Sequence, residues 1–194
     1  MKLTKNFTLA EMIASDRAKA NNIPNDPNSE QIEALTLLCL KTLEPVRELV
    51  GKPIIVTSGY RSPALNKLVG GSKTSQHLKG EAADIKVEGL TTQQLFETIV
   101  NSGVRFDQII QEFNAWVHIS FSKSRERRSM LYAHLDKNGR VYYKKYLAPS
   151  PFETAVSLLR SIHDLQDGPP LEKDAKKWHG TMVDIEVFLG RYEK

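Results

Sequence analysis

The sequence predicts an α+β protein: a small antiparallel sheet flanked by helices, followed by a C-terminal helical hairpin. Three observations lead to this prediction. Several segments alternate apolar and polar residues with a period of two, which is typical of half-buried strands. Longer segments repeat their apolar residues at helical spacing. Beyond residue 148 the strand patterns stop, and both remaining apolar patterns are helical.

Helices dominate the first third of the chain. Thr8 is suited to cap a short first helix, and a loop rich in Pro, Asn and Asp follows at 22–28. The apolar stripe over residues 29–50 predicts a long amphipathic helix that ends at Gly51. Pro45 lies inside this stripe, so we expect a kink there.

The middle of the chain alternates strands with short helices. The strands are expected over 54–60, 81–87, 107–113 and 116–121, a hairpin over 128–146, and the helices over 63–69 and 91–103. In the second strand Ala83 and Ile85 share one face, and Asp84 lies on the other. Asn138-Gly139 is a strong turn signal within the hairpin.

The chain length favours one core with a small appendage. Its 194 residues are 40% hydrophobic and 26% charged, an ordinary globular balance. We expect one domain over residues 1–148. Residues 149–194 would be a helical appendage, with helices over 152–166 and 171–190, of unknown role.

Composition excludes several classes of protein. Cys39 is the only cysteine, so neither an internal disulfide nor a thiolate zinc cluster can form. Apolar runs are shorter than the roughly 20 residues of a membrane span, and the N-terminus has no apolar stretch typical of a secretory signal. The net charge of +4 is a mild bias towards anionic partners, but no nucleic-acid-binding module accompanies it. The charged connector Lys123–Arg128 is expected to be a solvated loop that could contact an acidic polymer.

The stretch SQHLKGEAADI, residues 75–85, carries the first chemical signal. Asp84 lies on the strand face opposite the apolar residues, and His118 does the same on its own strand. If these strands are neighbours, both side chains face one space, and His77 lies in the loop just before. Two imidazoles and one carboxylate are ligands that a catalytic zinc takes. The spacing alone is equally consistent with two histidines that have structural roles and an aspartate exposed to solvent.

The wider motif resembles a known family. Ser75, His77, Gly80, Ala82 and Asp84 match Ser-x-His-x-x-Gly-x-Ala-x-Asp. SGYRSPALN and VGGS upstream, and WVHISF downstream, extend the match to about residues 5–147. The chain resembles the M15 zinc peptidases, in particular their short branch. These enzymes include D-alanyl-D-alanine carboxypeptidases and L-alanyl-D-glutamate endolysins, and the resemblance implies a hedgehog/DD-peptidase-like fold.

The resemblance implies a role for each residue of the site. His77, Asp84 and His118 would hold one zinc ion per chain. Arg61 would contact a substrate carboxylate or a developing oxyanion, although a plain ion pair with a nearby acid would also explain it. Ser75 would bind substrate or simply hold its loop.

The general base is where the sequence departs from part of the family. Many members place an acid three residues before the last histidine, where this chain has Ala115. The nearest acid is Glu112, six residues before His118. Glu112 shares a face with His118 only if residues 113–115 form an odd, three-residue loop; a two-residue turn would present Gln111 instead. We expect the odd loop and Glu112 as base, with Asp107 as the fallback.

The expected function is zinc-dependent hydrolysis of an amide bond in peptidoglycan stem peptides. Carboxypeptidase and endopeptidase specificity stay open, and the sequence does not indicate the oligomeric state. With no expected signal peptide or membrane span, the chain would be made in the cytoplasm. It would act on the cell wall after release, as a phage-type endolysin does. The alternative is a non-catalytic, zinc-stabilised cell-wall-binding module, which Ala115 favours.

Overall fold

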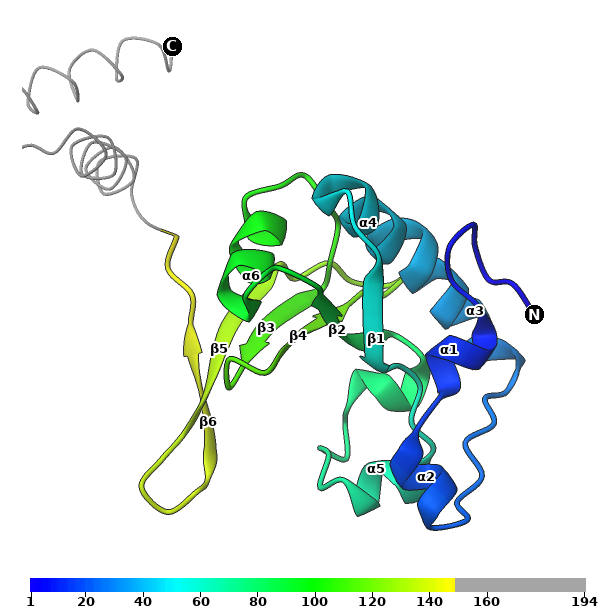
Figure 1. Cartoon of the computed structure of the whole chain (residues 1–194). Helices are drawn as coiled ribbons and strands as arrows, with labels where there is room; N and C mark the ends of the chain where they lie inside the picture. Colours follow the sequence, from blue (N-terminus) through cyan, green and yellow to red (C-terminus); the bar gives the residue numbers. More distant parts are fainter. Residues whose placement is uncertain (149–194) are drawn as a thin grey trace, which may run out of the picture. The chain divides into compact units, whose positions relative to one another are not determined.

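The fold is known from a computed structural model, which describes residues 1–148. Six strands form one sheet in the order β1-β2-β4-β3-β5-β6 (Figure 1). The strands are β1 (Ile54–Ser58), β2 (Ala82–Val87), β3 (Gln108–Glu112), β4 (Trp116–Ser120), β5 (Ser129–Leu135) and β6 (Val141–Lys145). Neighbouring strands are antiparallel except β3 and β5, which are parallel. The predicted α+β class is confirmed, while the parallel pair was not predicted.

The helices follow the predicted order, with one addition. They are α1 (Leu9–Ile13), α2 (Asp16–Ala20), α3 (Ser29–Leu38), α4 (Glu44–Val50), α5 (Pro63–Leu68) and α6 (Thr92–Val100). The short α2, capped by Ser15, was missed because five residues cannot show a helical period. The C-terminal helical hairpin and the domain boundary at residue 148 concern residues outside the described range and stay predictions.

The long helix over residues 29–50 forms as predicted but changes its pitch halfway. Between α3 and α4 lies one π-helical turn, η1 (Cys39–Leu43). Pro45 follows it and has no N–H to donate to the carbonyl of Lys41, so a regular α-helix would lose a hydrogen bond there. The expected kink therefore takes the form of a π segment. Gly51 ends the helix with φ of +64°.

The two faces of the sheet have different tasks. On one face Ala83, Ile85, Val117 and Ile119 are fully buried in the core, together with residues of α3 and α6. Figure 1 shows α6 lying across β3 and β4. The opposite face carries Asp84 and His118 and lines a cleft. The alternation read from the sequence therefore separates core from site.

The single cysteine belongs to the core, as predicted. Cys39 is fully buried, and burial raises the pKa of its thiol to about 12. It behaves as a small apolar residue. Among residues 1–148, no helix has the length and apolar character needed to cross a bilayer.

Candidate metal centre

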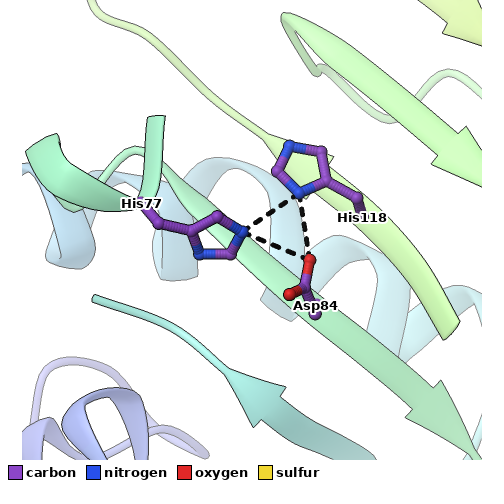
Figure 2. Close-up of side chains that lie close together, drawn as sticks. All are labelled: His77, Asp84 and His118. Carbon is purple, nitrogen blue, oxygen red and sulfur yellow. Dashed lines mark hydrogen bonds and ion pairs between the residues drawn. The ribbon is translucent and has the colours of Figure 1, made fainter. Parts of the chain in front are cut away.

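Three side chains from separate segments point toward one another (Figure 2), and all three line the cleft. Asp84 on β2 and His118 on β4 are direct cross-strand partners, so their side chains leave the sheet on the same side. His77 comes from η2, a single 3₁₀ turn over Gln76–Lys79 that precedes β2. The strand pairing that the sequence required is confirmed.

Gly80 lets the chain turn from η2 into β2. Its φ is +71°, and a Cβ at this position would lie 2.5 Å from the backbone oxygen of Gln31. Any other residue would be strained in conformation and would also clash with α3. Gly80 therefore fixes where His77 stands relative to β2.

Substitution of Gly80 should damage both the fold and the site. Gly51 is a matched control because its φ is +64° and its Cβ would meet nothing within 4 Å. Gly51→Ala should cost about 1 kcal/mol of unfolding free energy, and Gly80→Ala at least about 2 kcal/mol more. Urea denaturation measures both, and zinc affinity should fall only for Gly80→Ala. Equal costs would contradict the steric role.

The ligand atoms of the cluster lie within hydrogen-bond distance of one another. His77 Nε2 is 3.1 Å from His118 Nδ1 and 3.2 Å from Asp84 Oδ1, and His118 Nδ1 is 3.0 Å from the same oxygen. All three side chains are buried, with residue exposures of 2%, 4% and 8% for His77, Asp84 and His118. Two imidazole nitrogens and a carboxylate oxygen are the donor set of a catalytic zinc site.

The other nitrogen of His77 is held by the backbone. Its Nδ1 lies 2.6 Å from the carbonyl oxygen of Gly59, and this contact is a hydrogen bond when Nδ1 carries the proton. That tautomer leaves the lone pair on Nε2, which faces the other two ligand atoms. Metal-binding histidines in proteins are commonly oriented in this way. The donor set and its orientation therefore both fit a bound metal.

Arg61 is anchored beside the cluster. Its guanidinium pairs with Asp84 Oδ2, and its Nε donates to Ser58 Oγ at 2.8 Å. Asp84 therefore offers one oxygen to the histidines and the other to Arg61. Burial by itself would raise the pKa of Asp84, but His77 and His118 lower it far below its usual range. The residue is a carboxylate, as a metal ligand must be.

The loop between β3 and β4 is the three-residue loop that the sequence favours. Glu112 is paired with Trp116 and Ile110 with His118, so residues 113–115 form the loop. Phe113 and Asn114 both have φ of +55°, which closes it. Glu112 consequently lies on the same face of the sheet as His118.

Glu112 is placed in a partly desolvated position near the cluster. Burial raises the pKa of its carboxyl, and the charge of Asp84 raises it further, against the opposing influence of His118 and Arg61. A raised carboxyl pKa suits a group that must accept and return a proton near neutral pH.

Ser75 has a structural task in this structure. It caps η2, and its Oγ accepts a hydrogen bond from the backbone N–H of His77 at 3.4 Å. It also lines the cleft. The alternative that Ser75 holds its loop therefore has direct support, while substrate binding stays a prediction.

Asp107, the fallback base, is fully engaged elsewhere. Its carboxylate accepts hydrogen bonds from Arg127 Nε at 2.9 Å and Arg127 Nη2 at 2.7 Å. It also accepts from the Arg127 backbone N–H at 3.1 Å and from Gln76 Nε2 at 3.1 Å. The side chain is completely buried. Asp107 thus ties the connector after β4 to the residue preceding His77.

The connector Lys123–Arg128 is therefore only in part the solvated loop that was predicted. The sequence shows its charge but not that Asp107, far away along the chain, is buried beneath it. The position of Asp107 at the start of an expected strand was the available signal for this pair. A carboxylate that is buried there needs a cationic partner, because an unpaired buried charge is not stable.

Removal of the Asp107 charge should destabilise the protein. Asp107→Asn breaks the Arg127 pair, and we expect a loss of about 2 kcal/mol at pH 7, less than for a fully buried pair because Arg127 is 45% exposed. Burial raises the pKa of Asp107, but the bonds from Arg127 lower it overall, so the pair stabilises the folded state at neutral pH. This contribution should fade below about pH 4. Urea denaturation across pH tests it, with Asp26→Asn as control; a constant difference down to pH 2 would contradict the assignment.

The whole constellation lines one open cleft. Its volume is about 1020 Å³, enough for a peptide segment. The three cluster residues line it together with Arg61, Ser75 and Glu112. The aromatic side chains of Phe113, Trp116 and Tyr143 add to this lining. Tyr143 was missed by sequence reasoning because it is far from every motif and reaches the cleft only through the β3–β5–β6 pairing.

Comparison with known proteins agrees with this geometry. Residues 5–120 match the family model described as peptidase M15. A zinc D-Ala-D-Ala carboxypeptidase of Streptomyces albus G is 35% identical over 81 residues, or 41% of this chain. The match spans 31% of that relative, so it covers about a third of its length. The family match includes all three cluster residues and Glu112. The chain belongs to the M15 peptidase family.

Proposed function

We propose that this protein is a zinc-dependent peptidase that hydrolyses an amide bond in the stem peptides of peptidoglycan. The observation that carries the proposal is the His77–Asp84–His118 cluster with Glu112 on the same face of one cleft. Family membership and the zinc carboxypeptidase relative support the same class of reaction.

The metal is zinc. Nitrogen and carboxylate donors in this combination suit zinc better than the oxygen-only sites of magnesium or calcium. When bound, zinc supplies Lewis acidity that polarises a peptide carbonyl and makes water more acidic. Three protein ligands leave room for water and substrate.

Side chains of the protein would transfer the proton and bind the substrate. Glu112 accepts a proton from the attacking water and returns it to the leaving amine. Its raised pKa makes the carboxylate a stronger base for the first of these transfers. Arg61 is held by Asp84 and Ser58, and its Nη1 makes no hydrogen bond within residues 1–148. This group would donate to a substrate carbonyl or carboxylate. Ser75, which also lines the cleft, would add a contact to the peptide.

The proposal includes two specificities. Removal of a terminal D-alanine and cleavage between L-alanine and D-glutamate both need an amide placed against the cluster. The relative is named for the first reaction. An endolysin role, with action on the cell wall after release from the cytoplasm, belongs to this proposal as its biological setting.

A non-catalytic cell-wall-binding module is the second candidate. It is favoured by Ala115, which stands where many M15 members carry their acid. In that case the cluster would stabilise the fold through zinc, and Glu112 would have no chemical role.

Digestion of purified peptidoglycan separates the candidates. The protein is assayed as purified, after chelation, and after zinc is restored, with mass analysis of released fragments. The proposal expects fragments only with zinc, and their masses identify the bond. Zinc binding and wall binding without any fragment would support the second candidate instead.

A further inference from the structure

The cleft is lined by more cationic than acidic side chains. Among its lining residues five are Arg or Lys and three are Asp or Glu, and the proposed chemistry uses only Arg61 of the five. Arg125 and Arg127 belong to this lining and lie on the connector after β4. This connector follows residue 120, where the family match ends. Its arginines are therefore features of this chain rather than of the matched motif.

Arg127 has a structural partner. It binds Asp107 through two guanidinium nitrogens and a backbone N–H, and Gln76 supplies a further donor to the same carboxylate. A carboxylate has about four lone-pair sites. Asp107 is consequently saturated without help from Arg125.

Arg125 is the surplus cation. Its Nε lies 3.2 Å from Asp107 Oδ2, but its side chain makes no hydrogen bond within residues 1–148. The side chain is 44% exposed, while Asp107 is completely buried. Two guanidinium groups thus share one carboxylate, which leaves one positive charge in excess, and Arg125 lines the cleft with both terminal guanidinium nitrogens unbonded within residues 1–148.

The acids nearest along the connector and beneath it are occupied elsewhere. Glu126 accepts two bonds from Arg105, at 2.9 and 2.7 Å. Glu81 accepts from Ser122 at 2.9 Å and from Gln76 at 3.3 Å. Among residues 1–148, Asp107 is therefore the acid paired with Arg125, and neither Glu126 nor Glu81 forms an ion pair with it.

We infer that Arg125 binds a carboxylate of the substrate peptide, with Asp107 and Arg127 as its support. The inference rests on the proposed function, since a stem peptide with L-lysine at its third position carries two such groups: the α-carboxylate of D-glutamate and the C-terminal carboxylate. The guanidinium edge matches a carboxylate in a bidentate manner. Arg125 would therefore make the cleft prefer acidic over amidated stem peptides.

Binding can be measured without turnover in the Glu112→Gln protein. Isothermal titration would use the pentapeptide L-Ala-γ-D-Glu-L-Lys-D-Ala-D-Ala, its analogue amidated at the D-glutamate α-carboxyl, and its analogue amidated at the C-terminus. Arg125→Ala should weaken binding of the parent peptide about 10-fold. It should leave one of the two analogues unchanged, and that analogue identifies the carboxylate that Arg125 holds.

Controls keep the result specific. Lys123→Glu changes charge two residues away, at a side chain that is 80% exposed and outside this cleft, and should alter binding less than 2-fold. Arg125→Lys should recover part of the affinity, and unchanged melting temperatures would show that the fold is retained. Equal weakening for all three peptides, no weakening for any, or no binding to the Glu112→Gln parent would each overturn the inference. If binding depends on Arg125 but the wild type releases no fragments, the carboxylate site stands and the proposed hydrolysis fails.

Discussion

Replacement of Glu112 by glutamine is expected to lower kcat by at least about 10³-fold while zinc content stays unchanged. Glutamine keeps the size of the side chain but cannot accept a proton. Glu112 lies on the cluster face of β3 without being one of the three clustered residues, so metal binding does not depend on it. Steady-state cleavage of a synthetic stem peptide, with metal analysis of the same sample, measures both quantities.

A matched control separates this effect from a general loss of charge. Glu88→Gln removes an exposed carboxylate outside the cleft and should leave kcat within 2-fold of the wild type. Retention of most of the wild-type rate in Glu112→Gln would exclude Glu112 as the base. A parallel loss of zinc would instead assign it to the metal site.

Replacement of His118 by alanine is expected to abolish stoichiometric zinc binding. His118 supplies one of three converging donor atoms from a buried position on β4, and a two-donor remnant would bind zinc at least about 100-fold more weakly. Dialysis against a zinc buffer followed by elemental analysis gives the content, and peptidase activity should be lost with it.

His134→Ala provides the matched histidine control. His134 lies on β5 and stacks on Tyr142, outside the cleft. Its replacement should leave about one zinc per chain, as expected for a site closed by three protein ligands. Full zinc content in His118→Ala would show that the metal binds elsewhere.

Much of the fold was predictable because its signals are local. Helix caps at Thr8 and Thr91, the break at Gly51 and the alternation over β2 and β4 each depend on a few neighbouring residues. The parallel contact of β5 with β3 was not predictable in this way, because it depends on where a charged connector crosses the molecule. The π turn before Pro45 was not predictable either. It arises because Pro45 has no backbone N–H to donate, which changes the hydrogen bonding of the turn before it.

The residues that gather at the site were more predictable than the ion pairs around them. Alternation placed Asp84 and His118 on one face, and the absence of a two-residue turn signal placed Glu112 beside them, which the pairing of Glu112 with Trp116 confirms. The pairing of Arg61 with Asp84 was open as an alternative and is present. The Asp107–Arg127 pair was missed, because packing across the molecule, rather than spacing, brings these side chains together.

The most direct test of the zinc centre and of the catalytic role of Glu112 is a combined measurement on the wild type and Glu112→Gln. Zinc content and the release of stem-peptide fragments from purified peptidoglycan would be determined on the same preparations. We expect about one zinc ion per chain in both proteins, and released fragments from the wild type alone. Zinc in both without fragments from either would contradict the catalytic role, and the absence of zinc from the wild type would contradict the metal centre itself.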